Sequence, residues 1–358
     1  MPLIDLQKVA RMQVESAYGT VPGAFTDAMS RYTEAFVPNA NAESIRRAGF
    51  AGAWRPAFRP ATGALDNPFA FSTEIVPFSA DEPGSPPTLA RGLHHEAMIM
   101  AGFGVDATVA NQVSYNLLDT SHGSVGWEFY EHDETGAAGH LWTATGARAN
   151  GIIKWNMGSR LMMDLVGNCA TLTPVDFGAA ISPVFQDSGY VAGILAPRCR
   201  LPYVALGVSG LVSAVDVAGA NFPFLGDFLE MEIRLNNGLS VHRAANATGG
   251  ITRVQLTPQP IEIDLTVEAG LFATWDPRFY RDEKSNVECT FTFVAADPTG
   301  GQNDYLDIVF TGAIENVEPS SQDGRKVWKL KMQGLFGGTG GVNCTPSTQL
   351  QLIHRTAP

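Results

Sequence analysis

The segment Asp119-Thr120-Ser121-His122 contains the three residue types of a hydrolase triad: an acid, a serine and a histidine. In such enzymes the three residues come from distant segments, and in one large class the serine lies in a sharp turn between a strand and a helix. Neither condition is met here. We therefore interpret the segment as a hydrogen-bonding turn between a strand that ends at Leu117 and one that begins at Val125.

Two other stretches contain residue types that bind metal ions. His94 and His95 are adjacent, and adjacent helical residues point in different directions, so the pair does not chelate one ion by itself. We expect one of them to be partly buried and the other to lie at the surface. The stretch from Asp297 to Asp304 lacks the acid spacing and terminal Glu of an EF-hand, and its Pro, Gly and Asn suit a hairpin connection. We expect no metal and no cofactor, with an ion in this stretch as the open alternative.

The six tryptophans and the many carboxylates would also suit a carbohydrate-binding or glycosidase β-sandwich, which needs stacking platforms and two facing carboxylates. Three of the tryptophans alternate in step with apolar residues, so core packing is the simpler account. These pairs are Trp127 with Phe129, Trp155 with Met157, and Trp328 with Leu330. The sequence therefore indicates no enzyme, and the sugar-binding interpretation remains the alternative.

Composition favours a globular, turn-rich, largely β protein, because 45% of the 358 residues are apolar and the chain has 37 Gly and 22 Pro. The formal charge of −12 argues against a general affinity for nucleic acid, which requires clustered Lys and Arg. The cysteines have neither metal-ligand nor disulfide spacing, so we expect reduced, mostly buried thiols. They are Cys169, Cys199, Cys289 and Cys344.

No membrane span or secretory signal is expected. Between Leu201 and Gly226 only Asp216 is charged, but prolines and glycines interrupt this stretch, which a spanning helix tolerates poorly. Residues 1–8 lack the basic region and apolar core of a signal peptide.

Alternating apolar and polar residues predict antiparallel strands, because successive side chains on a strand point to opposite faces. The clearest examples are Leu229–Leu235, Ile261–Val267, Val287–Phe293, Leu306–Phe310 and Trp328–Met332. A short helix interrupts the strands in each half. The first has Thr88 as its N-cap, an apolar face of Leu89, Leu93, Ala97 and Met100, and Gly102 at its stop; the second opens at Asp276-Pro277.

We divide the chain into four parts. Residues 1–41 form an N-terminal arm with few core residues, 42–182 a first β unit, 183–227 an Ala/Gly-rich connection, and 228–358 a second β unit. Both units contain two strands, a helix and about three further strands, which fits an internal duplication. Identity between the halves is too low to see directly, so duplication and a single unit both stay open.

A series of short motifs follows one another along the chain. They are Glu15-Ser-Ala-Tyr-Gly-Thr20, Gly102-Phe103 at the end of the first helix, Val113–Leu117, Val125–Glu131, Gly146-Ala147-Arg148 and Ile153–Met157. Their order resembles that of the major tail tube protein of long-tailed bacteriophages, which has an opening Glu-x-x-Tyr-Gly-Thr. In that family a helix ending in Gly-Phe then leads into a strand, a hairpin, a Gly-Ala-(Arg/Lys) turn and a closing strand. The segment from Phe228 to Ile353 is similar to the family as well.

The resemblance implies a mainly β fold, an antiparallel β-sandwich or barrel with two tandem tube-like units, each with one short helix. Family members with two units per chain assemble as trimers with pseudo-six-fold symmetry, and one-unit members as hexamers. A chain of this length suits the trimer, with the hexamer as the alternative. The implied function is structural: stacked rings form a virion tail tube, assembled in the host cytoplasm, that conducts DNA into the host without binding it specifically. The family also implies a tape measure protein and a tail terminator as partners.

Two sets of residues follow from this expectation. Tyr18, Gly19 and Thr20 would join the arm to a neighbouring ring, because an aromatic anchor beside a flexible glycine fits a pocket; an arm folded back on its own domain is the alternative. The most acidic strand faces would line the lumen, where like charge repels DNA, although an ordinary solvated surface is equally common. These lumen residues are Glu230, Glu232, Glu262, Asp264 and Glu268.

Overall fold

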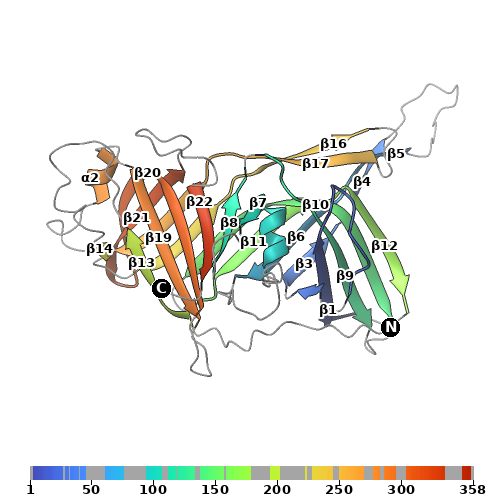
Figure 1. The fold of residues 1–358 in the computed structure, drawn as a ribbon, viewed down its shortest axis with the longest axis horizontal. Helices are drawn as coiled ribbons and strands as arrows, with labels where there is room; N and C mark the ends of the chain where they lie inside the picture. Colours follow the sequence, from blue (N-terminus) through green and yellow to red (C-terminus); the bar gives the residue numbers. More distant parts are fainter. Residues whose placement is uncertain are drawn as a thin grey trace, which may run out of the picture.

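A computed structural model of the chain is mainly β, with one large antiparallel sheet, two small two-stranded sheets and short helices (Figure 1). It describes residues 3–26, 29–31, 33–39, 41–45, 61–75, 94–106, 112–118, 120–133, 138–156, 159–178, 194–201, 222–223, 228–244, 250–269, 277–282, 286–295, 304–334 and 349–355.

The elements of the first half begin with a long N-terminal strand and include one helix of a turn and a half. They are β1 Leu3–Val14, β2 Ser30–Arg31, β3 Glu34–Pro38, β4 Asn41–Ile45, β5 Ala61–Asp66, β6 Pro68–Glu74, α1 His95–Met100, β7 Phe103–Asp106, β8 Gln112–Leu117, β9 Val125–Asp133, β10 Gly139–Asn156, β11 Met162–Asn168 and β12 Thr171–Phe177.

The second half is also dominated by strands. Its elements are β13 Ile194–Leu201, β14 Phe222–Pro223, β15 Phe228–Arg234, β16 Gly238–Arg243, β17 Ile251–Thr257, β18 Glu262–Glu268, α2 Pro277–Asp282, β19 Asn286–Ala295, β20 Asp304–Gln322, β21 Arg325–Gly334 and β22 Leu350–Arg355.

The long strand β10 organises the first half. Its N-terminal part lies between β9 and β12, and its C-terminal part pairs with β11, which continues to β6 and β3. The pairing of β10 with β9 shifts register between Ala144 and Ala147, where Gly146 has φ 66°. Gly146-Ala147-Arg148 is therefore a bulge inside one continuous strand. The turn that the resemblance implies at this place is wrong, because a positive-φ glycine bends a strand as readily as it ends one.

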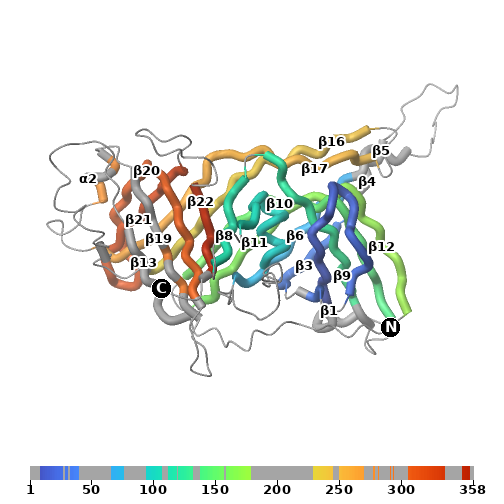
Figure 2. Tube along the Cα trace, in the orientation of Figure 1, coloured from blue at the N-terminus to red at the C-terminus, as the bar shows by residue number. Residues whose placement is uncertain are grey.

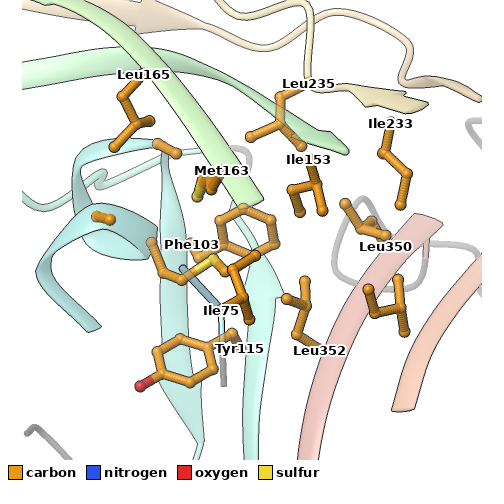
Figure 3. Close-up of a cluster of buried hydrophobic side chains, with 14 of the residues drawn as sticks. Ile75, Phe103, Tyr115, Ile153, Met163, Leu165, Ile233, Leu235, Leu350 and Leu352 are labelled. Atoms are coloured by element: carbon orange, nitrogen blue, oxygen red, sulfur yellow. The ribbon is translucent and has the colours of Figure 1, made fainter. Parts of the chain in front are cut away.

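Two pairings join the halves into one sheet. β10 pairs with β15, whose other edge continues to β18, β21 and β20, and β8 pairs with β22. Figure 2 shows red β22 running beside β8, although more than 200 residues separate them in the sequence. The core crosses the same seam: Ile233, Leu235, Leu350 and Leu352 pack with Phe103 and other residues of the first half in a single cluster (Figure 3).

The structure corrects the expectation that residues 1–41 contribute little to the core. β1 pairs with β9 along its length, and Ala10, Met12 and Phe36 belong to the main core cluster. Apolar and polar residues do not alternate along β1, because both of its faces are covered. The four consecutive residues Val9, Ala10, Arg11 and Met12 are all buried.

Other expectations are confirmed. All five strands predicted in the second half exist, and α2 begins at Pro277. Helix α1 ends at Met100 with Gly102 at φ 92°, as a glycine stop requires. Thr88, Leu89 and Leu93 lie outside the described residues, and the described helix begins at His95 with His94 at its N-cap position.

Candidate functional site

The five acidic residues expected to line a lumen do lie on one face of the sheet. Glu232 is directly opposite Asp264 across β15 and β18, and Arg234 is opposite Glu262. The intervening Met231, Ile233, Ile263 and Leu265 are buried in the core, so the acids point away from it. Glu230, Glu232, Glu262, Asp264 and Glu268 are all only partly buried in the single chain.

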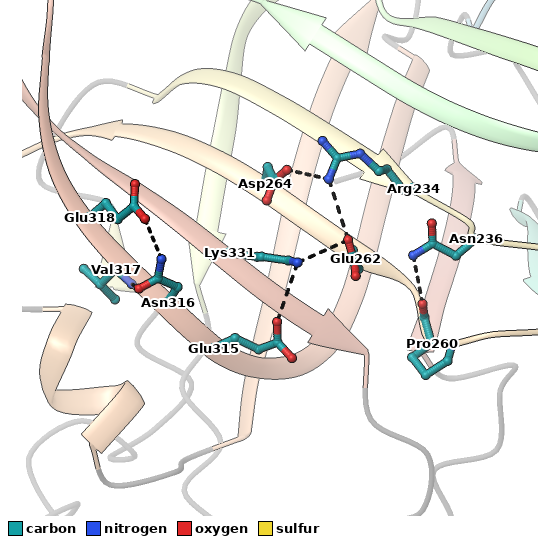
Figure 4. Close-up of polar contacts among 10 residues, drawn as sticks. All are labelled: Arg234, Asn236, Pro260, Glu262, Asp264, Glu315, Asn316, Val317, Glu318 and Lys331. Atoms are coloured by element: carbon teal, nitrogen blue, oxygen red, sulfur yellow. Dashed lines mark hydrogen bonds and ion pairs between the residues drawn. The ribbon is translucent and has the colours of Figure 1, made fainter.

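Basic side chains are inserted between these acids. The guanidinium of Arg234 lies 2.7 Å from Glu232, 2.7 Å from Asp264 and 3.7 Å from Glu262. The ammonium of Lys331 lies 3.5 Å from Glu262 and 3.9 Å from Glu315, so a chain of ion pairs runs across four strands (Figure 4). The side chains are 27–41% exposed, and ion pairs this accessible contribute little to stability.

This face is less acidic than the sequence analysis implies. The register across β10, β15, β18, β21 and β20 places basic side chains among the carboxylates on it. The carboxylates include Glu230, Glu232, Glu262, Asp264, Glu268, Glu315 and Glu318, and the bases include Lys154, Arg234, Arg325, Lys329 and Lys331. Among these residues the carboxylates outnumber the bases, and the ion pairs neutralise part of their charge.

A second cluster of polar residues surrounds the bulge of β10. Glu15 is 9% exposed, and its carboxylate accepts hydrogen bonds from the backbone N–H groups of Gly19 and Gly146, both at 2.7 Å. It also accepts one from the hydroxyl of Ser124 at 2.5 Å. Three donors from separate segments thus satisfy a buried carboxylate, which would be costly to bury without them.

Tyr18 and Arg148 complete this cluster. The Tyr18 hydroxyl donates to the carbonyl of Gly146 at 3.2 Å and accepts from the backbone N–H of Val254 in β17 at 2.5 Å. Arg148 stacks over the Tyr18 ring, 4.9 Å from its centroid, and donates to the carbonyls of Gly123, Val254 and His122 at 3.0, 2.8 and 2.5 Å. Burial raises the pKa of Tyr18 and lowers that of Arg148, which nevertheless stays protonated.

The Glu-x-x-Tyr-Gly-Thr motif therefore makes its contacts within its own chain. Glu15 and Tyr18 hold the bulge and the root of the β16–β17 hairpin, and Thr20 closes a tight turn by accepting from the Ser16 N–H at 3.1 Å and donating to Ala17 at 2.8 Å. This arrangement matches the alternative in which the arm folds back on its own domain. Contact of Tyr18, Gly19 and Thr20 with a neighbouring ring stays a prediction.

His94 and His95 are both fully or nearly buried, so the expectation that one lies at the surface is wrong. His94 Nε2 lies 3.1 Å from Nε2 of His354 in β22, and His95 Nδ1 lies 3.1 Å from the Tyr115 hydroxyl in β8. This histidine cluster spans the seam between β8 and β22. Burial lowers the pKa of His94 to about 3 and that of His354 well below its usual value, and the neighbouring histidine lowers each further. Both imidazoles are neutral at pH 7.

The remaining sequence candidates take structural positions. His122 Nε2 lies 2.9 Å from the carbonyl of Leu118, and residues 120–124 form no strand, as expected for a connecting turn; Asp119 lies outside the described residues. Trp127, Trp155 and Trp328 are buried in the core, which confirms their predicted packing.

Cys169 is a buried free thiol whose pKa burial raises, as expected for a reduced core cysteine. The side chains of Cys199, Cys289 and Cys344 and the loop 297–303 lie outside the described part of the chain. Within the described part, no three His, Cys, Asp or Glu side chains are grouped so that they could hold a metal ion.

The sequence pattern missed the Arg234 and Lys331 ion pairs, the Glu15–Tyr18–Arg148 cluster and the His94–His354 contact. Each joins residues distant in the chain, and only the spacing of Glu15 and Tyr18 within one motif gave a signal. No helix within the described residues has the length and apolar character needed to cross a membrane. No protein-family model and no curated protein matches this sequence.

Proposed function

We propose that this protein is a structural subunit of a phage tail tube, in which rings of the chain stack into a conduit for DNA ejection. The observation that carries the proposal is the order of the tail-tube motifs along the sequence, from Glu15-Ser-Ala-Tyr-Gly-Thr20 to Ile153–Met157. A mainly β chain with one large antiparallel sheet is the kind of fold this function needs.

The polar face of the sheet supports the proposal. A tube wall must present negative charge to DNA and must lack clusters of Lys and Arg, because such clusters attract the phosphates. On the face of β15, β18 and their neighbours, Arg234 and Lys331 lie beside carboxylates, and Lys154 of β10 lies 3.0 Å from Asp164 of β11. The positive charge of these three side chains is therefore opposed by a neighbouring carboxylate. An acidic face of this kind is also found on ordinary soluble proteins, so it supports the proposal without carrying it.

The edges of the sheet provide surfaces for ring formation. β12 pairs with β10 on one side, and its residues Thr173–Asp176 are exposed in the single chain. The unpaired edge of such a strand is a template for pairing with a strand of another chain, although Pro174 has no N–H to donate. Repetition of one head-to-tail contact around an axis closes a ring. In the proposed tube, such pairings join the sheets of neighbouring chains into one wall.

Negative-stain electron microscopy of the purified full-length chain tests the proposal. The expected result is rings or tubes with a continuous central channel. A chain that stays monomeric at high concentration in sedimentation, with no rings on the grid, would refute it. Binding to immobilised glycans by such a monomer would instead support the sugar-binding alternative, which the burial of Trp127, Trp155 and Trp328 already makes less favourable.

The copy number is tested separately. We expect three chains per ring with pseudo-six-fold symmetry, because a 358-residue chain suits two tandem units. Native mass spectrometry of isolated rings reads this number directly. Six chains per ring would contradict the trimer and leave the tube intact. The tape measure protein and tail terminator are the partners expected at the ends of such a tube.

A further inference from the structure

The β16–β17 hairpin connects the two halves of the molecule. It is inserted between β15 and β18, which belong to the second half, and it runs along the upper edge of the first half toward β4 and β5 (Figure 1). A two-stranded hairpin alone is marginally stable in water, so its direction must be fixed by contacts with the rest of the chain. Residues Ile251 and Val254 supply part of this contact by packing with Ala170 of the first half.

Polar contacts at the same place are more directional than this small apolar cluster. Val254 is held at both of its backbone groups: its N–H donates to Tyr18, and its carbonyl accepts from Arg148. Tyr18 and Arg148 are in turn fixed by the bulge carbonyl of Gly146 and by the 122–123 carbonyls. A guanidinium with several fixed acceptors and a ring stacked on it has little freedom to rotate.

We propose that Tyr18 and Arg148 are positioning residues that clamp the β16–β17 hairpin to the first half of the molecule and so set the direction in which its tip points. The clamp acts at Val254, midway along β17, so its release frees the outer part of the hairpin while the base at Gly238 and Thr257 stays paired. Through Glu15, which binds Gly19 and Gly146, the clamp also links the end of β1 to the hairpin. This inference does not depend on the tube and applies to the single chain.

Hydrogen exchange of the protein at low concentration tests the clamp in Tyr18→Phe. This variant keeps the ring and its stacking on Arg148 but loses the hydroxyl bonds to Val254 and Gly146. We expect amides of β16 and β17 to exchange about tenfold or more faster, because a lost buried hydrogen bond shifts local opening by about this factor. Amides of β15 and β18 should keep their rates. Arg148→Lys, which keeps the charge and loses the multiple carbonyl contacts, should give the same local pattern if Tyr18→Phe folds poorly.

Tyr130→Phe is the matched control, because its hydroxyl also makes two hydrogen bonds, accepting from Arg11 and donating to Glu128, but lies far from the hairpin. Hairpin exchange that is no faster in Tyr18→Phe and Arg148→Lys than in Tyr130→Phe would overturn the proposal. Uniform acceleration in all strands would overturn it too, since that outcome marks a general loss of stability. Tube formation is scored separately on the same samples, so failure of the clamp and failure of the proposed function are distinguished.

Discussion

Acidification should weaken the seam between β8 and β22 through the buried pair His94 and His354. The folded-state pKa of His94 is about 3, and that of His354 lies well below 6.5, whereas both take the ordinary value once the chain unfolds. Below pH 6.5 the unfolded chain therefore binds protons that the folded chain does not, and the free energy of unfolding falls as the pH falls. The stability is complete above about pH 7 and is lost progressively toward pH 3.

The size of the effect follows from this linkage. Between pH 7.5 and 5.5 each imidazole that stays neutral in the fold lowers the free energy of unfolding by about 1.4 kcal/mol, or about 2.8 kcal/mol for the pair. The groups packed nearby are His95 and Glu96 on α1 and Tyr115 on β8, all buried. Carboxylates ordinarily titrate below pH 5.5, so the histidines account for most of the change in the free energy of unfolding between pH 7.5 and 5.5.

Urea unfolding of dilute protein at pH 7.5, 6.5 and 5.5 measures the effect. In His354→Gln, which keeps a polar side chain near His94 but removes one titrating group, the loss between pH 7.5 and 5.5 should shrink by about half. His140→Gln is the control, because its side chain is 51% exposed, and it should follow the unmodified protein. An unmodified protein whose stability is flat over this range, or a His354→Gln variant that loses as much as the control, would refute the reasoning.

Further tests address the core and the proposed wall. Gly167→Ala should destabilise the fold by about 1–3 kcal/mol, because a Cβ there would collide with the Arg148 carbonyl and the Phe69 ring, whereas Gly23→Ala, with open space around it, should have little effect in thermal denaturation. Glu230→Lys should leave tubes intact and slow DNA ejection several-fold at low salt but not at high salt, since salt screens the attraction between the new lysine and the DNA phosphates. Asp323→Lys, which makes the same charge change at the exposed β20–β21 turn, is the control. If Glu230→Lys ejects DNA at the same rate at low and high salt, Glu230 does not line the lumen. Deleting residues 2–20 should leave no folded protomer by circular dichroism, because β1 belongs to the core; a folded protomer that fails to polymerise would favour the arm interpretation instead.

The ion pairs of the polar face determine which acids can be used in such tests. Glu262 and Asp264 lie beside Arg234, and Glu262 also lies beside Lys331, so a lysine at either position would join a cluster of like charge. A loss of tubes in those variants would report misfolding as readily as a changed lumen. Glu230, whose described contact is to the Thr266 hydroxyl at 3.5 Å, avoids this ambiguity.

The sequence by itself determined the strands that have one buried and one exposed face. β15, β18 and β21 alternate apolar and polar residues, and that alternation survives folding because one side of the sheet is core and the other is water. It also determined the helix stop at Gly102 and the start of α2 at Pro277, since backbone conformation at glycine and proline depends on the residue itself. The alternation did not predict β1, because both faces of that strand are covered. It did not predict that β10 is continuous, because that strand contains a bulge.

Only the tertiary structure decided which polar residues meet. Arg234 neutralises acids on β18, His94 faces His354 across the seam, and Tyr18 reaches Val254 more than 200 residues away. These pairs depend on strand order and register, and a register shift of one residue would turn the side chains of Arg234 and His354 to the other face of the sheet. A local pattern states that a residue is polar and on which face it lies, but its partner comes from another strand. The charge balance of the polar face, the protonation of the histidines and the direction of the hairpin are for this reason properties of the fold.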